Sequence, residues 1–166
     1  MYRILVLVVV LAASGCGDEA PDSSAAPAPG TSATAAAATG RPTAATARNA
    51  TRITVRGSRF GRMLWGPRRQ AIYIFERDGR DRTRCYGECA KAWPPVYTKA
   101  RPTAGPGVRQ ALLASIRRRD GRRQVTYAGK PLYYYAHEGP GQVLCHDVNL
   151  NGGLWWVLGP YGKRRP

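Results

Sequence analysis

The amino-acid sequence predicts a mainly β fold: a small antiparallel β domain built from two degenerate repeats, with one or two short helices. Two observations lead to this prediction. The chain contains a series of short segments rich in β-branched and aromatic residues, which favour extended backbone. Its second half also matches the first at a constant offset of 60 residues. All four tryptophans, both phenylalanines and eight of the nine tyrosines lie in residues 51–166, where we therefore expect the folded domain.

The expected strands are short and are separated by turn signals. Asp120-Gly121 is a strong hairpin signal between two of them. Two segments favour a helix, Gly87–Ala92 and Val108–Ala114, the second because its apolar residues recur at helical spacing. The expected strands are Arg52–Arg56, Arg62–Trp65, Gln70–Phe75, Ser115–Arg119, Arg123–Tyr127, Pro131–Ala136 and Leu154–Leu158.

The internal repeat is clearest in a motif rich in aromatic residues. The segment Tyr73-Ile74-Phe75-Glu76-Arg77-Asp78 corresponds to Tyr133-Tyr134-Tyr135-Ala136-His137-Glu138 at the offset of 60 residues. The same offset relates Cys85 to Cys145, and each copy ends near a tryptophan, Trp93 in the first and Trp155 in the second. We predict repeat 1 at about residues 59–100 and repeat 2 at about residues 115–161.

These motifs resemble a known family. Tyr73-x-Phe75-x-x-Asp78, the Cys85–Ala90 segment followed by Trp93-Pro94-Pro95, and the Tyr127–Tyr135 segment are similar to bacterial lipoproteins described as a secreted repeat of unknown function. The mark of this family is a tyrosine-x-aromatic-x-x-aspartate motif. The resemblance covers about residues 59–161 and departs in repeat 2, which has Glu138 at the acidic position and Cys145-His146 where glycine is expected. The family resemblance implies the location of an exported lipoprotein and an architecture of repeats. It does not imply an established activity.

The N-terminus is typical of an exported lipoprotein. Residues 1–15 form a predicted signal peptide, whose apolar stretch Ile4–Ala13 is too short for a permanent membrane span. Ala13-Ser14-Gly15-Cys16 resembles a lipobox, so we expect Cys16 to receive a diacylglyceryl group and to become the mature N-terminus. This anchor places the protein at the cell membrane on its extracytoplasmic face. The alternative is an ordinary secretory signal with an incidental cysteine.

A linker is expected between the anchor and the domain. The chain from residue 17 to residue 50 consists almost entirely of Ala, Thr, Pro, Ser and Gly. Such a composition cannot bury enough apolar surface to offset the entropy lost on ordering. Residues 16–50 are therefore predicted to comprise the lipidated cysteine and a disordered tether.

The strong positive charge points to anionic partners. Without the predicted signal peptide the chain keeps 25 basic and 10 acidic side chains, and 21 of the bases are arginine, which binds phosphate and carboxylate in bidentate fashion. Export excludes nucleic acid as the expected partner. Besides the membrane that holds the anchor, the expected partners are phospholipid head groups or anionic wall polymers. The alternative is a general arginine bias with solvated side chains.

Three cysteines remain for the domain once Cys16 is lipidated. The family motif contains Cys85 and Cys89, and the resemblance therefore implies a disulfide between them, while the alternative joins Cys145 to one of the two. We expect no cofactor. The competing hypothesis is a copper, zinc or haem site at Cys145, His146 and His137, although their spacing is not that of a recognisable metal motif. A thiol oxidoreductase is less favoured, because the spacing is Cys-x-x-x-Cys.

The acidic and aromatic motif residues have structural and functional interpretations. Asp78 and Glu138 are expected to cap backbone N–H groups in strand-ending turns, and the alternative is an acid–base pair. Tyr73, Phe75, Tyr133 and Tyr135 are expected either to build the core or to form an aromatic binding surface. We find no nucleophile elbow, phosphate loop or catalytic triad, so we expect a protein that is not an enzyme.

The sequence therefore predicts a membrane-anchored binding or scaffolding module for envelope components. The competing function is a redox-linked or metal-handling envelope protein built around the three domain cysteines and the two histidines.

Overall fold

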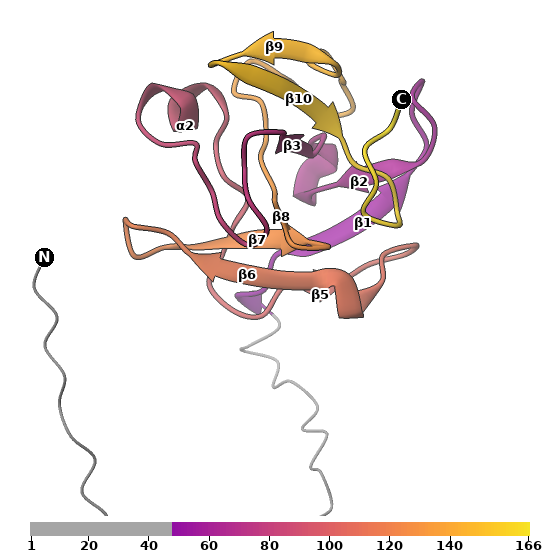
Figure 1. Cartoon of the computed structure of the whole chain (residues 1–166). Helices are drawn as coiled ribbons and strands as arrows, with labels where there is room; N and C mark the ends of the chain where they lie inside the picture. Colours follow the sequence, from indigo (N-terminus) through magenta and orange to yellow (C-terminus); the bar gives the residue numbers. More distant parts are fainter. Residues whose placement is uncertain (1–47) are drawn as a thin grey trace, which may run out of the picture. The chain divides into compact units, whose positions relative to one another are not determined.

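The structure is a computed structural model that describes residues 48–166 (Figure 1). The predicted signal peptide, Cys16 and the linker up to residue 47 lie outside the described residues. Within residues 48–166 no helix is long and apolar enough to cross a membrane.

The described part of the chain is mainly β, as the sequence predicts. The strands form three small sheets with the orders β2-β1-β5, β3-β10-β9 and β4-β7-β6, and β8 pairs with β7. Every strand pair among these is antiparallel except β1 with β5, which is parallel. The strands are β1 (Arg52–Arg56), β2 (Met63–Trp65), β3 (Tyr73–Phe75), β4 (Tyr97–Thr98), β5 (Thr103–Ala104), β6 (Leu113–Arg117), β7 (Arg123–Tyr127), β8 (Lys130–Pro131), β9 (Val148–Leu150) and β10 (Gly153–Val157), and the α-helix is α2 (Glu88–Ala92).

The two repeats are interlocked through their backbones. Strand β3 of repeat 1 pairs with β10 of repeat 2, and β4 of repeat 1 pairs with β7 of repeat 2. Between the halves, the N–H of Tyr73 donates to the carbonyl of Tyr133 and the N–H of Tyr133 donates to the carbonyl of Tyr73, each at 2.9 Å. Each repeat therefore completes the sheets of the other, and much of the backbone pairing in each half depends on the second half.

Two hairpins show how turn residues set the strand register. In the β6–β7 hairpin the N–H of Arg118 donates to the carbonyl of Arg122, and Gly121 takes a φ of 80°. This confirms the turn predicted at Asp120-Gly121, but the strand before it is Leu113–Arg117 and not Ser115–Arg119, because Arg118 already belongs to the turn. The β9–β10 hairpin turns at Asn151 and Gly152, which have φ values of 54° and 82°.

Two other predicted elements need correction. The helix predicted at Val108–Ala114 is wrong: only Gln110–Leu112 forms a 3-10 turn, and Leu113 and Ala114 belong to β6, where Leu113 is buried opposite Tyr127. The strand predicted at Pro131–Ala136 is largely replaced by isolated bridges. Tyr133 forms one bridge with Tyr73 and another with Pro95, because this segment crosses between sheets and does not run within one. The helix predicted at Gly87–Ala92 is confirmed as α2.

The core consists of two clusters, and both repeats contribute to each. One cluster is rich in aromatic residues and contains Tyr73, Trp93, Tyr133 and Trp155, all with no exposed surface. The other is mainly aliphatic and includes Ile53, Leu64, Ile72 and Leu132. Burial of these large side chains is the main favourable contribution to folding of so small a domain.

Candidate functional site

The tyrosines and carboxylates of the repeat motif bond across the two halves. The Tyr73 hydroxyl of repeat 1 donates to Glu138 Oε1 of repeat 2 at 2.6 Å. The Tyr133 hydroxyl of repeat 2 donates to Asp78 Oδ2 of repeat 1, also at 2.6 Å. The two bonds are equivalent under the 60-residue offset. The motif therefore joins the halves and does not serve each half separately.

Each carboxylate also caps the turn that follows it. Asp78 Oδ1 accepts a hydrogen bond from the backbone N–H of Arg84 at 2.7 Å. Glu138 Oε1 accepts the equivalent bond from the N–H of Leu144. Both carboxylates thus cap backbone N–H groups, as the sequence predicts from their position before a glycine.

Burial changes the acid–base properties of these pairs. Desolvation raises the pKa of Asp78 to about 6, although the Tyr133 hydroxyl, the Arg84 N–H and the charge of Arg118 each lower it. Desolvation also raises the pKa of Glu138, opposed by its bonds from Tyr73 and Leu144. The pKa values of both tyrosines are raised, chiefly by burial and further by the facing carboxylates. Each tyrosine therefore stays protonated and acts as a donor.

The remaining aromatic motif residues form a continuous stack inside the domain. Phe75 stacks on Trp155 with ring centroids 4.4 Å apart, and Trp155 stacks on Trp93 at 3.8 Å. Tyr135 lies 4.8 Å beyond Trp93 in a tilted arrangement. On the opposite face of β3, Ile74 belongs to the aliphatic cluster, which Tyr134 also contacts. Tyr73, Phe75 and Tyr133 are thus buried in the core, and Tyr134 and Tyr135 are half-buried against it, so these segments do not form an exposed aromatic face.

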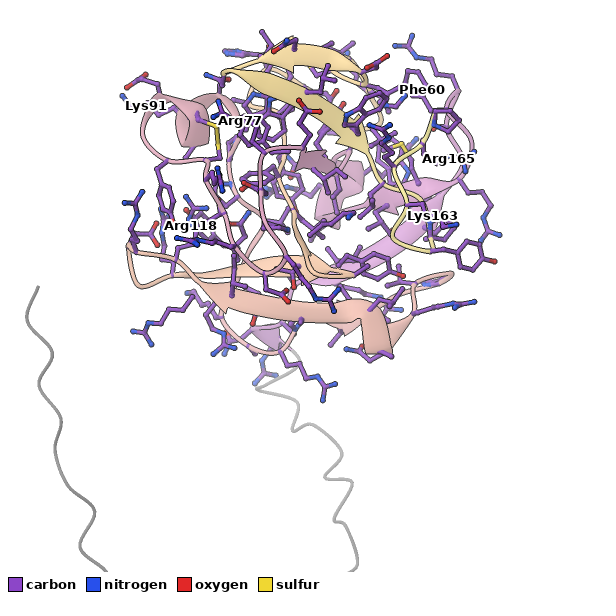
Figure 2. The ribbon with its side chains drawn as sticks, in the orientation of Figure 1. Phe60, Arg77, Lys91, Arg118, Lys163 and Arg165 are labelled. Atoms are coloured by element: carbon purple, nitrogen blue, oxygen red, sulfur yellow. A yellow bond between two sulfur atoms is a disulfide. The ribbon has the colours of Figure 1, made fainter. Side chains whose placement is uncertain are left out.

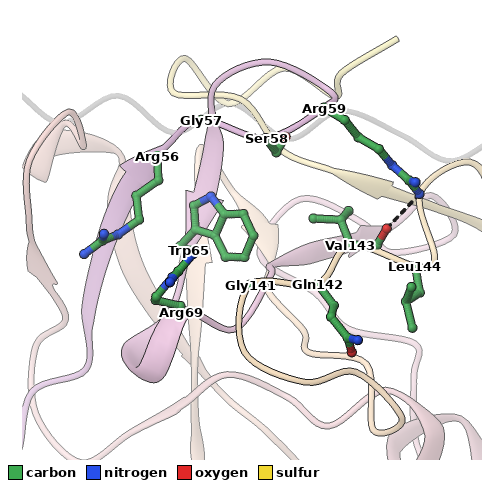
Figure 3. A pocket seen from close by; sticks show the side chains of 10 residues that line it. All are labelled: Arg56, Gly57, Ser58, Arg59, Trp65, Arg69, Gly141, Gln142, Val143 and Leu144. Atoms are coloured by element: carbon green, nitrogen blue, oxygen red, sulfur yellow. Dashed lines mark hydrogen bonds between the residues drawn. The ribbon is translucent and has the colours of Figure 1, made fainter.

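The capped turns line two related hollows at the surface. Residues 141–144 line a cavity of about 530 Å³ together with Arg56, Gly57, Ser58 and Arg59, and with Trp65 and Arg69 (Figure 3). Residues 81–84 line a second cavity of about 460 Å³ together with Tyr86, Ile116, Arg117 and Arg119. The turn residues of the two hollows differ by 60 in number, as do Arg59 and Arg119. Each repeat thus contributes a turn to one hollow and a hairpin to the other.

A model of the family described as a secreted repeat of unknown function matches residues 55–97 and 114–158. The chain belongs to this family. Its two matched segments correspond to the two predicted repeats and confirm the resemblance of the motifs. No curated protein and no solved structure matches the chain. The description of the secreted repeat supports an extracytoplasmic location.

Arginine dominates both hollows of this secreted-repeat protein. Of the residues that line the larger hollow, three are arginine and none is acidic. Arg59 is engaged in its wall, since its guanidinium donates to the carbonyl of Val143 at 2.9 Å. The smaller hollow has four arginines but also Asp81, which forms an ion pair with Arg80 at 3.9 Å. The larger hollow is therefore the more suitable of the two for an anion.

Arg118 has a structural role that the sequence does not reveal. Its side chain is almost fully buried and donates to Gln124 Oε1 at 2.6 Å and to the carbonyl of Cys85 at 2.8 Å. It also contacts Thr83 Oγ1 at 3.3 Å and lies over the ring of Tyr86. Because Arg117 and Arg119 on either side are exposed, nothing in the run of arginines distinguishes Arg118. The contacts explain its burial, since a charge inside a protein needs hydrogen-bond partners.

The cysteines of the domain differ between the repeats. Cys85 and Cys89 form a disulfide, as the family resemblance implies, with Cα atoms 5.3 Å apart, and it joins α2, which contains Cys89, to the segment before it (Figure 2). Cys145 is a free, buried thiol whose pKa is raised by desolvation. In repeat 2 the position equivalent to Cys89 is occupied by Asn149, so Cys145 has no corresponding partner. The alternative pairing through Cys145 is therefore wrong.

The structure does not assemble the metal ligands considered from the sequence. His146 Nδ1 accepts a hydrogen bond from the N–H of Val157 at 3.3 Å, and its ring lies against Phe60 at 4.2 Å. His137 instead meets the edge of Tyr135. Within residues 48–166 no three His, Cys, Asp or Glu side chains converge in a metal-binding arrangement. The competing metal hypothesis therefore has no preformed ligand set in the part of the chain described.

Proposed function

We propose that this secreted-repeat protein is a lipid-anchored, non-enzymatic binding module that holds anionic components of the cell envelope. Cys16 is the proposed lipidation site and residues 1–15 the proposed signal peptide. The anchor supplies the location, and the folded domain supplies the binding surface.

The observation that carries the proposal is the unbalanced charge of the domain. Residues 48–166 contain 24 of the 26 basic residues and only 7 of the 10 acidic residues of the chain. Two of these acids, Asp78 and Glu138, bond to tyrosines in the interior. Within residues 48–166, ion pairs use only three carboxylates, Asp81, Glu88 and Asp120. Most arginines therefore remain available to anions outside the protein.

Binding assays with the mature chain test this proposal. The chain from residue 16 onward, with Cys16→Ser to prevent thiol reactions, is mixed with phosphatidylglycerol vesicles, with phosphatidylcholine vesicles, and with a soluble poly(glycerol phosphate). We expect binding to one or both anionic partners and none to phosphatidylcholine. Binding is expected to weaken when salt is raised from about 0.05 M to about 0.5 M, since the screening length shortens. Failure to bind either anionic partner at low salt would reject the proposal.

A separate experiment tests the anchor. The wild-type chain expressed in a bacterial host is expected to fractionate with membranes and to carry diacylglycerol on Cys16, which mass spectrometry of the N-terminal peptide detects. The Cys16→Ser variant is expected to lose both properties. A second mass spectrum, of the intact native protein, distinguishes the competing function, because a bound copper, zinc or haem would favour metal handling.

A further inference from the structure

The larger hollow, between the β1–β2 hairpin and residues 141–144, combines unpaired charge with a preformed shape. Arg56 and Arg69 line it, and within residues 48–166 neither forms an ion pair. Figure 3 shows both guanidinium groups on one side of Trp65, whereas Arg59 extends to the opposite side. Arg56 and Arg69 are thus the two cations not committed to the wall of the hollow.

The walls of the hollow are held in place by hydrogen bonds. The N–H of Gly141 donates to the carbonyl of Arg69 at 2.7 Å, and the Arg59 guanidinium donates to the carbonyl of Val143. Glu138, at the start of the same turn, accepts from Leu144. Three separate bonds therefore fix the turn, so a ligand does not have to order it on binding.

The backbone that presents Arg69 has an uncommon conformation. Arg68 and Arg69 both lie in the left-handed region, with φ values of 57° and 59°. Residues other than glycine, asparagine and aspartate rarely adopt this region, and such conformations concentrate at binding and active sites. Here the conformation holds Arg69 at the rim of the hollow.

The indole of Trp65 lies in the wall of the hollow and has an unpaired donor. Trp65 is 4% exposed, and its indole Nε1–H is buried without a hydrogen-bond partner among the described residues. Figure 3 shows the ring between Arg56 and Val143, with the indole nitrogen turned towards Gly57 and Ser58, which also line the hollow. Because this donor is unpaired and lies in the wall of a cationic hollow, its environment is sensitive to an anion bound there, which makes Trp65 a reporter of binding.

We propose that this hollow binds the phosphate of a phosphate ester, with Arg56 and Arg69 supplying charged donors and Trp65 lining the site. The inference rests on the proposed function and names the site at which it is carried out. A phosphate ester matches the chemistry, because guanidinium groups bind phosphate oxygens through paired, charge-assisted hydrogen bonds. The equivalent hollow of repeat 1 has Asp81 in its lining and no tryptophan, so it lacks this combination.

Nuclear magnetic resonance of the mature chain provides the first test. Four indole N–H signals are expected from the four tryptophans. Those of Trp93 and Trp155 already donate to Asn151 and to the carbonyl of Leu150. Inorganic phosphate, added at constant ionic strength, is expected to shift the Trp65 signal, identified from the Trp65→Phe variant or, if that variant does not fold, from contacts with neighbouring protons. An unmoved Trp65 signal at saturating phosphate overturns the site.

A pair of double variants with equal loss of charge provides the second test. Arg56→Gln with Arg69→Gln removes the two free cations of the hollow. Arg52→Gln with Arg101→Gln is the matched control, because both residues are exposed and neither lines this hollow. Removing the pair in the hollow is expected to weaken phosphate binding at least roughly tenfold, as for the loss of charge-assisted hydrogen bonds, and the control less than about twofold. Equal losses in both variants overturn the site.

The remaining titrations identify the source of the phosphate. They also distinguish failure of the proposed site from failure of the proposed function. Glycerol phosphate, phosphatidylglycerol vesicles and poly(glycerol phosphate) are titrated into the wild type and both double variants. The partner whose binding depends on Arg56 and Arg69 identifies the source as lipid or polymer. If anionic partners bind all three proteins equally well, the proposed function stands and the hollow is rejected. If the wild type binds neither vesicles nor polymer, the proposed function fails whatever free phosphate does.

Discussion

The two repeats share their centre and differ at their edges. Tyr73 and Tyr133 bond in the same way to the carboxylate of the opposite repeat, and Trp93 and Trp155 stack on each other between them. Beyond this centre, repeat 1 continues into helix α2, closed by a disulfide, whereas repeat 2 continues into the β9–β10 hairpin. The same motif therefore tolerates two different structures immediately after it.

A second difference lies in the turns between the carboxylate and the cysteine. Thr83 of repeat 1 shares a hydrogen bond of 2.6 Å with Tyr133 and also contacts Arg118. Its counterpart in repeat 2 is Val143, which lacks a hydroxyl group and lies in the larger hollow. The turn of repeat 1 thus bonds to the interior through Thr83, whereas the turn of repeat 2 has an apolar side chain at this position. The comparison indicates that the shared motif holds the halves together, while the turns that follow it differ in their contacts.

The largest expected effect comes from breaking the shared centre. Trp155→Ala or Trp93→Ala removes half of a buried ring stack that both repeats use, so each is expected to destabilise the protein by about 3–5 kcal/mol. Trp156→Ala, on a partly exposed side chain, is the control and is expected to cost clearly less. Urea unfolding followed by circular dichroism measures the difference. Similar losses for Trp155 and Trp156 would contradict the central role of the stack.

Removing the hydroxyl group of Tyr73 or of Tyr133 tests how much the hydrogen bonds of each repeat contribute to stability. Tyr133→Phe removes a hydroxyl that bonds to both Asp78 and Thr83, although Asp78 keeps its bond from the Arg84 N–H. Tyr73→Phe removes a hydroxyl that bonds to the Glu138 carboxylate, which keeps its bond from Leu144. Both are expected to destabilise the fold by about 1–3 kcal/mol, with the larger loss for Tyr133→Phe. Chemical denaturation of the two variants under the same conditions gives the ranking, and a reversed order would show that the network around Thr83 matters little.

Of the two segments that follow the motif, only that of repeat 1 contains a disulfide. A loop of five residues restricts the unfolded chain only modestly, so Cys85→Ser with Cys89→Ser is expected to cost about 2 kcal/mol or less. Alkylation of the native wild-type domain is expected to be slow, because Cys145 is buried. Unfolding without reductant is expected to release one reactive thiol in residues 48–166, counted by mass spectrometry. Release of three thiols would exclude the disulfide.

The smallest expected effect is a dependence of stability on pH. Because the pKa of Asp78 is about 6 in the folded protein and lower when unfolded, the folded state binds more protons between pH 4 and pH 6. The free energy of unfolding should therefore fall by at most about 2 kcal/mol as pH rises through this range. Asp78→Asn is expected to remove most of this slope, whereas Glu138→Gln removes a further part because its pKa is also raised. An Asp78→Asn variant with the wild-type slope would assign the effect to other groups.

Local patterns in the sequence were sufficient for several elements. The strand Arg52–Arg56, the turn at Asp120-Gly121 and the short helix near Cys89 depend mainly on neighbouring residues, and all are present. Strand β9, and with it the β9–β10 hairpin, is missing from the predicted strands, although Asn151-Gly152 is a typical signal for a primed turn. The helix predicted at Val108–Ala114 failed because burial of Leu113 against Tyr127 outweighs a weak local periodicity.

The sequence by itself determined the repeat, the family and the excess of positive charge, because offsets, motifs and composition need no knowledge of spatial contacts. Only the tertiary structure decided which tyrosine meets which carboxylate, since the partners are separated by 55 and 65 residues and belong to opposite repeats. It likewise separated the buried Arg118 from the free Arg56 and Arg69, which are chemically identical side chains. Burial and partners set the role of an arginine, and both arise only when distant segments pack together.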